Sequence, residues 1–188
     1  MDALATLSAA AGLAWASGLR VYLVLFVIGL LGRLGYLVLP DALAPLSNDW
    51  VLAASGVMTV AEFFADKIPV VDSIWDAVHS FIRIPAGAVL AAGMMGLDNP
   101  VLTMAAAILG GAVTSSAHLS KAGTRAVVNT SPEPFSNWAA SFSEDGMALG
   151  AVWLAYAFPW IFLALLVLFL ILVALLLPRL MRVLGALL

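Results

Sequence analysis

The sequence contains no cysteine, only two histidines and few charged side chains for a chain of 188 residues. Without cysteine, the chain can form neither disulfide bonds nor thiolate metal sites. Charged residues make up 10% of the chain, whereas soluble domains carry about 25%. Because 64% of the residues are hydrophobic and the mean hydropathy is +1.10, this composition indicates an integral membrane protein.

Motifs for catalysis and nucleotide binding are also missing. The chain has no His-Glu-x-x-His pair, no nucleophile elbow, no glycine-rich phosphate loop and no basic stripe for nucleic acid. We therefore expect no cofactor and no nucleic-acid partner. A membrane-embedded enzyme is the weaker alternative, because carboxylates and histidine also serve in acid-base chemistry or hold a metal, whose identity the sequence leaves unknown.

The length of the chain sets the scale of the fold. At about 20 residues per span, 188 residues allow one all-α, polytopic membrane domain of roughly five to seven segments and no separate soluble domain. We therefore predict a single integral membrane domain over residues 1–188. Asp2 is the only charged residue before Arg20, so the basic region of a cleaved signal peptide is missing and we expect the N-terminus to be retained.

The first apolar stretch, residues 3–39, is too long for one ordinary span. A single helix of this length would measure about 55 Å, whereas a bilayer core is about 30 Å thick. The small pair Ser17-Gly18 is the natural position for an interruption. This predicts a half-helix over residues 4–17 and a span over residues 19–38, the alternative being one long tilted helix.

Prolines and charges delimit the remaining segments. Proline breaks or kinks a helix because it lacks the backbone N–H, which predicts interruptions at Pro69 and Pro159. The last segment is rich in Leu, Val and Phe, so we expect it to face lipid. The expected elements are a loop over 40–49, a span over 50–66, a polar-faced re-entrant helix over 72–83, a segment of small residues after Pro85, a turn over 97–100, a span over 101–120, a break at Pro132 and Pro134, and a helical hairpin over 143–158 and 160–178.

Polar residues gather on three helical faces. Asp72, Asp76, His79 and Arg83 are spaced by four, three and four residues, which places all four on one side of a helix. The stripe Thr114, His118, Lys121 and Arg125 repeats this spacing, and Asn137, Ser141 and Glu144 share a face as well. Three polar stripes can therefore converge between helices.

Burying these charges requires compensation. An unpaired charge at the bilayer centre costs about 2.5–3.5 kcal/mol on insertion scales, so buried charges should pair or line water. We favour a transporter or channel-like protein, in whose hydrated cavity carboxylates bind a cation or proton while Arg83, Lys121 and Arg125 bind an anionic group. The alternative is a structural or assembly protein whose clusters are ion pairs at the membrane surface. The candidate residues for binding a solute or ion are Glu62, Asp66, Lys67, Asp72, Asp76, His79, Arg83, His118, Lys121, Arg125, Asn137, Ser141, Glu144 and Asp145.

Basic residues predict the orientation. If residues 72–83 are re-entrant, one side holds Arg20, Lys67, Lys121, Arg125, Arg179 and Arg182, and the other holds mainly Asp41, Asp49 and Asp98. By the positive-inside rule, the charged clusters lie at the cytoplasmic face of a multi-pass inner-membrane protein, with Arg33 as an exception. The expected partners are the lipid bilayer and the small solute or ion, and self-association as a homo-oligomer is left open.

The sequence also predicts an internal repeat. Six residues recur in identical form 63 positions later, which predicts halves over about 1–97 and 98–188. The orientation of the two halves, parallel or inverted, is left open, and the alternative is chance similarity among small residues. The recurring residues are Pro69, Ser73, Trp75, Gly87, Ala88 and Val89, matched by Pro132, Ser136, Trp138, Gly150, Ala151 and Val152.

Three stretches carry a resemblance to a known family. GLRVYLVLF, EFFADKIPVVDSIWDAVHSFIRIPAGA and HLSKAGTRAVVN…SNWAASFSEDGMAL closely resemble the bacterial membrane family called domain of unknown function 4126, over roughly residues 12–154. The resemblance implies a membrane protein and no defined chemistry. Residues that fit the family pattern are Gly18, Leu19, Tyr22, Glu62, Asp66, Lys67, Asp72, Ser73, Arg83, Gly87, Lys121, Arg125, Asn137, Ser141, Glu144 and Asp145.

Overall fold

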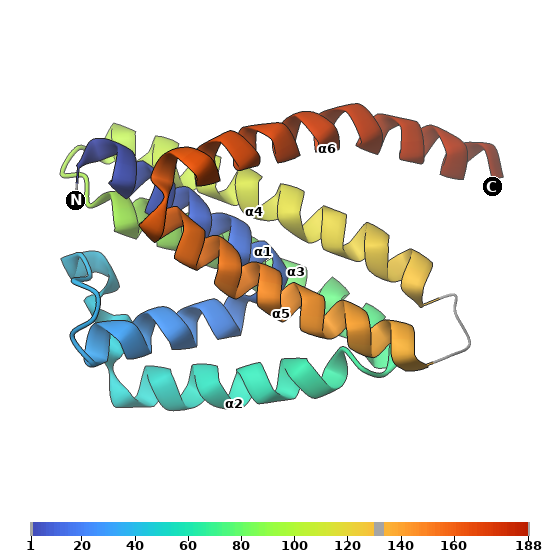
Figure 1. Ribbon diagram of the computed structural model, residues 1–188, viewed down its shortest axis with the longest axis horizontal. Coiled ribbons are helices and arrows are strands. Elements are labelled where there is room, and N and C mark those ends of the chain that lie inside the picture. The colour runs from blue at the N-terminus through green and yellow to red at the C-terminus, as the bar shows by residue number, and fades with distance from the viewer. Residues whose placement is uncertain (1, 130–133, 188) are drawn as a thin grey trace.

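The computed structural model describes residues 2–129 and 134–187, apart from the side chains of residues 69, 134 and 177–187. Within these ranges the chain is helical and contains no strand (Figure 1). The elements are α1 (Ala3–Arg33), η1 (Asp41–Ser47), α2 (Asp49–Ala65), α3 (Pro69–Met95), α4 (Pro100–Val128), α5 (Pro134–Ala157) and α6 (Pro159–Leu187). The all-α fold class is therefore confirmed.

Four helices are long and apolar enough to cross a membrane. They are Ala3–Arg33, Val70–Met95, Pro100–Val128 and Pro159–Leu176. By length and composition, these helices support the membrane character that the overall composition predicts. The segment of α6 is mostly exposed on the protein, as expected for a helix that faces lipid.

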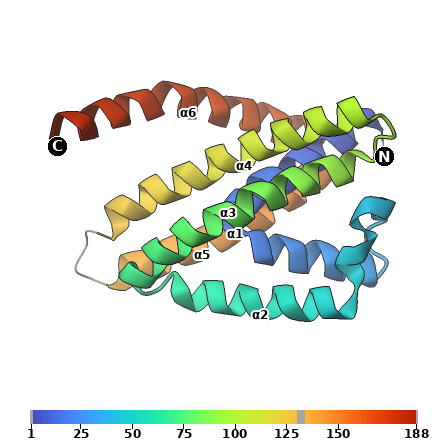
Figure 2. The ribbon, with the colours of Figure 1, turned by 180° about the vertical axis from the view of Figure 1, so that it is seen from behind.

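Helix α1 is bent sharply at its middle. Arg20 has φ −144° and ψ 73°, which lie outside the helical region and interrupt the helix. Both halves of α1 lead from the centre of the molecule to the end where the N-terminus lies (Figures 1 and 2). The predicted interruption is confirmed, two residues after Ser17-Gly18, and the single tilted helix is excluded. The second half ends at Arg33, so the expected extension to residue 38 was wrong.

Gly18 allows this bend to lie close against α4. A Cβ atom at Gly18 would collide with the carbonyl oxygen of Thr114 and with the side chain of Ala117. Glycine is therefore required by close approach of the two backbones rather than by an unusual φ value. The consequence is that Arg20, two residues later, lies in the interior of the bundle with 1% exposure.

The prolines behave differently from one another. Pro69 and Pro159 begin α3 and α6, as expected for prolines in a first helical turn, and Pro134 begins α5. Pro85, by contrast, lies inside α3, so residues 72–83 and the small-residue segment form one continuous helix. The expected separate re-entrant helix at 72–83 was therefore wrong. In membrane helices, packing against neighbours compensates for a proline inside the helix, which explains why α3 continues.

Several other helices are also longer than expected. The expected span over 101–120 continues as α4 to Val128, and the arms of the hairpin start earlier and end later than residues 143 and 178. The loop over 40–49 contains the short helix η1, and the turn before α4 is confirmed. The expected break at Pro132 falls outside the described residues.

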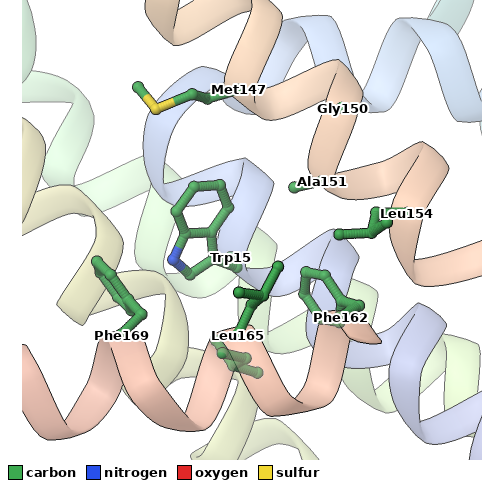
Figure 3. A pocket seen from close by; sticks show the side chains of 9 residues that line it. Trp15, Met147, Gly150, Ala151, Leu154, Phe162, Leu165 and Phe169 are labelled. Atoms are coloured by element: carbon green, nitrogen blue, oxygen red, sulfur yellow. The ribbon is translucent and has the colours of Figure 1, made fainter. Parts of the chain in front are cut away.

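The helices surround α1. Helices α2 to α6 run alternately between the two ends of the molecule, and α3 and α4 lie side by side over much of their length (Figure 2). An apolar pocket of about 250 Å³ lies between α1, α5 and α6 and is lined by Trp15, Phe162 and Phe169, among others (Figure 3). Its walls present almost only carbon, so the polar chemistry of this protein is located elsewhere.

Candidate functional site: a buried network of ion pairs

The three predicted polar stripes converge inside the helix bundle. Lys67 and Asp145 are half-buried, and the other candidates are buried. The clusters are therefore not solvated faces at the surface of the protein. The buried candidates are Glu62, Asp66, Asp72, Asp76, His79, Arg83, His118, Lys121, Arg125, Asn137, Ser141 and Glu144.

Arg20, at the bend of α1, connects α2 with α5. Its Nη1 pairs with Asp66 at the end of α2, and its Nε lies 2.7 Å from the Asp145 carboxylate. Its Nη2 donates to the carbonyl and hydroxyl oxygens of Ser141, both at 3.0 Å, and lies 3.3 Å from Glu144. The guanidinium group has the fixed planar shape that such multiple pairing requires.

Lys121 and Arg125 extend the network from α4. The Lys121 ammonium lies 3.3 Å from Asp66, 3.1 Å from Asp76 and 3.5 Å from Glu144. Arg125 binds Glu144 through two parallel hydrogen bonds, from Nε at 2.6 Å and from Nη2 at 2.9 Å. Such bidentate pairs are among the strongest hydrogen bonds in proteins. Together these two cations join α4 to α2, α3 and α5.

Arg83 forms a second centre in the middle of α3. It is fully buried, pairs with Glu62, and donates to Asp76 at 2.6 Å. Its Nη1 also lies 3.3 Å from Nδ1 of His118, whose Nε2 lies 2.6 Å from the Ser80 hydroxyl. Since the Ser80 hydroxyl donates to the carbonyl of Asp76, its oxygen is left to accept, which favours neutral His118 with its proton on Nε2.

His79 is placed among aromatic rings. It stacks on Trp75 with 4.0 Å between ring centroids and meets the edge of Tyr22 at 5.6 Å. Its Nδ1 lies 2.8 Å from the carbonyl of Trp75. These contacts indicate a packing role for His79, in contrast to the ion-paired environment of His118.

The remaining candidates lie at the margin of the network. Asp72 accepts a hydrogen bond from Asn129 at 2.9 Å, and the backbone carbonyl of Asn137 accepts one from Arg125 at 3.4 Å. Lys67 donates to the carbonyl of Phe63 at 2.9 Å and lies over the ring of the same residue. Burial lowers the pKa of the Lys67 ammonium, because the charged form is less well solvated there.

The network is almost balanced in formal charge. With both histidines neutral, its six carboxylates carry one more charge than its five cations. Omitting the half-buried Lys67 and Asp145 leaves the same excess of one negative charge. The carboxylates are Glu62, Asp66, Asp72, Asp76, Glu144 and Asp145, and the cations are Arg20, Lys67, Arg83, Lys121 and Arg125.

Comparison with known proteins identifies the family but assigns no activity. The model of the family described as "Domain of unknown function (DUF4126)" matches residues 7–179 of the chain. The chain belongs to this family. No curated protein and no solved structure gave a significant match. The DUF4126 match confirms the resemblance drawn from the sequence motifs and leaves the chemistry to be argued from the geometry.

The structure adds residues that the stripes did not include. Among these added residues, Arg20 has the most ion-pair partners, namely Asp66, Glu144 and Asp145. Ser80 contacts His118, and Asn129 contacts Asp72. A signal for Arg20 existed, because it is the only charge between Asp2 and Arg33 and lies two residues after the predicted interruption at Ser17-Gly18. Nothing in the pattern of the sequence distinguishes Ser80 from the other small polar residues in its helix.

Cavities adjoin the network on several sides. One of about 440 Å³ lies between α1, α2 and α5 and reaches Arg20, Glu62 and Asp145. Another of about 590 Å³ lies between α3 and α4 and reaches Asp72 and His118, and a third of about 220 Å³ adjoins Lys121 and Glu144. Charged groups and apolar side chains line these cavities together.

Proposed function

We propose that this protein is a multi-pass inner-membrane transporter or channel-like protein that moves a small solute or ion past the buried ionic network. The observation that carries the proposal is the joint presence of a buried, charge-rich network and adjoining cavities of about 440 and 590 Å³. Ion pairs that only stabilised the fold would gain nothing from open space beside them, and replacing buried pairs by apolar packing is often neutral or stabilising.

The proposed topology has five crossing helices and one re-entrant element. Helices α2 to α6 cross the membrane, and the bent α1 enters and leaves on one side, with Arg20 at its tip. The shortest crossing helix, α2, has 17 residues and a length of about 26 Å, close to the thickness of a bilayer core. The end that holds Lys67 faces the cytoplasm, in keeping with the positive-inside rule.

The internal repeat fits this topology as two parallel helical hairpins. The hairpin α2–α3 corresponds to α4–α5, and Ser73 and Trp75 of α3 correspond to Ser136 and Trp138 of α5. Both hairpins run in the same order between the two ends of the molecule and pack against α1 (Figure 1). Related halves that meet around a central site are common among transporters.

In the proposed mechanism, charged groups exchange partners as the solute passes. A cation or proton competes with the arginines for the carboxylates, and an anionic group competes for Arg83, Lys121 and Arg125. The bend of α1 is suited to act as the barrier between the two sides of the membrane, because α1 packs closely against α4 at Gly18. Movement of this bend would connect the cavities beside it.

Flux across proteoliposomes tests the proposal. We expect the reconstituted protein to move at least one of Na⁺, K⁺, Cl⁻ and protons, followed with ²²Na⁺, ⁸⁶Rb⁺, ³⁶Cl⁻ and an internal pH dye. Glu62→Gln, next to the cavity of about 440 Å³, should reduce this flux about tenfold or more. Asp98→Asn, which alters an exposed carboxylate in a turn, should leave it unchanged.

The opposite result would favour the alternative class. If folded wild-type protein moves none of the four ions faster than empty liposomes, transport of small ions is excluded. Co-purification of a stoichiometric membrane partner under those conditions would support a structural or assembly protein.

A further inference from the structure

Three carboxylates near the start of α3 form a compact group within the network. Asp66 caps the end of α2, and Asp72 and Asp76 lie one turn apart on α3. Each offers an oxygen such that all three atoms lie within 4.8 Å of one another. Oxygen ligands at this spacing are close enough for one metal ion to contact all three.

A separate observation points to a ligand for this group. Each of the three carboxylates is at least 95% buried, yet one oxygen of each accepts no hydrogen bond from the described part of the chain. These atoms are Oδ1 of Asp66, Oδ1 of Asp72 and Oδ2 of Asp76. A buried carboxylate oxygen without a partner is costly, so a fold that retains one on each of three neighbouring carboxylates is suited to supply them to an ion.

The neighbouring cations leave these oxygens available. Arg20, Lys121 and Arg125 all approach Oδ2 of Asp66, and Lys121 also approaches Oδ1 of Asp76. Arg125 Nε lies 3.9 Å from Oδ1 of Asp72, which is too long for a hydrogen bond. The arginines and the lysine therefore pair with Oδ2 of Asp66 and Oδ1 of Asp76. Oδ1 of Asp66 and Oδ2 of Asp76 stay available to an ion.

The charge of the network selects the class of ion. Its carboxylates exceed its cations by one, so a single positive charge brings the buried network to neutrality. A divalent ion would leave an uncompensated positive charge in a region of low dielectric constant. Access is provided by the cavity of about 590 Å³ between α3 and α4, which Asp72 and Asp76 both line.

From these observations we infer that Asp66, Asp72 and Asp76 bind a monovalent metal cation, with Na⁺ as the ion to test first. The inference rests on the proposed function for its physiological meaning, since such an ion would be the transported or coupling ion. Binding itself does not depend on transport. A failed flux assay with intact binding would remove the proposed function and leave the site, whereas flux without binding would remove the site alone.

The test uses the full chain purified in detergent. Thermal unfolding is followed while NaCl replaces choline chloride at constant ionic strength and pH. Because an ion that binds only the folded state stabilises it, we expect the melting temperature to rise with Na⁺ and to saturate. Asp72→Asn should raise the Na⁺ concentration for half-saturation at least tenfold, and the matched control Asp98→Asn should respond like wild type.

A second measurement protects the test against a misfolded variant. Equilibrium dialysis of wild-type protein with ²²Na⁺ should give about one ion per chain, displaced by unlabelled Na⁺ and not by choline. The inference is overturned by equal responses in Asp72→Asn and Asp98→Asn, or by the absence of bound ²²Na⁺. It is also overturned if Ca²⁺ or Mg²⁺ binds in place of Na⁺, or if lowering the pH alone stabilises the protein while Na⁺ has no effect, which would indicate a proton site.

Discussion

At the scale of single residues, several charged side chains in the network each pair with more than one oppositely charged group. Asp66 faces three cations, Arg20, Lys121 and Arg125. All three come from other helices, because α2, whose end Asp66 caps, has no basic residue in its last turn. Arg83, in turn, is held by two carboxylates from different helices. Removing one member of such a group therefore leaves several buried charges without compensation.

Substituting Arg83 tests this dependence. Arg83→Ala should lower the free energy of unfolding in detergent by about 3–5 kcal/mol, because Glu62 and Asp76 would remain buried without their partner. Arg33→Ala removes an exposed pair with Asp49, whose side chains are 51% and 76% exposed, and should cost about 0–1 kcal/mol. Denaturant unfolding of the two purified variants measures the difference. Equal small losses in both would show that Arg83 is solvated.

At the scale of elements, small residues bring the helices close enough for the charges to meet. Gly87 of α3 lies against Thr114 of α4, whose hydroxyl oxygen lies 2.8 Å from the carbonyl oxygens of both Ala14 and Gly110 and can donate to either. This contact joins α1, α3 and α4 at one level of the bundle. The polar stripe of α4 begins at Thr114, so the same contact sets the position of His118 one turn further along.

A larger residue at this contact should separate the helices. In Gly87→Leu, the new Cβ would lie within 2.8 Å of Cβ of Thr114, and overpacking of this kind typically costs about 1–3 kcal/mol. Gly123→Leu on α4 is the matched control, because a Cβ there meets no atom within 4 Å. Leucine also favours helix over glycine by about 1 kcal/mol, so the control should be neutral or stabilising in a thermal-shift assay. A stable Gly87→Leu protein would contradict the close packing of α3 and α4.

At the scale of the whole molecule, the charges are distributed unevenly along the bundle. The turn after α2, with Lys67, and the last turns of α4, with Arg125, lie at one end (Figure 1). Asp41 and Asp98 are exposed at the other end, next to the two ends of α1. The network reaches from the first of these ends to the middle, where α1 bends at Arg20 and where Arg83 lies near the centre of α3. Beyond them, the two arms of α1 bury apolar side chains, among them Leu13, Val24 and Ile28.

With the proposed inner-membrane topology, this polarity predicts which loops face which compartment. The natural chain has no cysteine, so single cysteines can be placed at Ile68, between α2 and α3, and at Asp98, between α3 and α4. A membrane-impermeant maleimide added from the periplasmic side should label Asp98→Cys, and label Ile68→Cys only after the membrane is disrupted. The reverse pattern would invert the orientation. Labelling of both from one side would show that α3 does not cross.

The sequence alone was sufficient for properties that depend on neighbours along the chain. Composition predicted a helical membrane protein, and helical spacing predicted which polar residues of α3, α4 and α5 share a face. That these faces are buried was left open by the sequence and is shown by the structure. Interruptions at Pro69 and Pro159 also follow from local chemistry, because proline lacks a backbone donor wherever it occurs. Pro85 was misjudged, since the packing that maintains α3 around it comes from other helices.

Only the tertiary structure decided which charges pair and which segment folds back. Arg83 pairs with Glu62, 21 positions earlier, and Arg20 contacts Ser141, 121 positions later. Partners so distant in sequence meet only when the helices dock, and helical periodicity within one segment contains no information about the rotation or depth of another. The bend of α1 was predicted near Ser17-Gly18, but Arg20 became the centre of the network because α2 and α5 bring Asp66 and Asp145 to it.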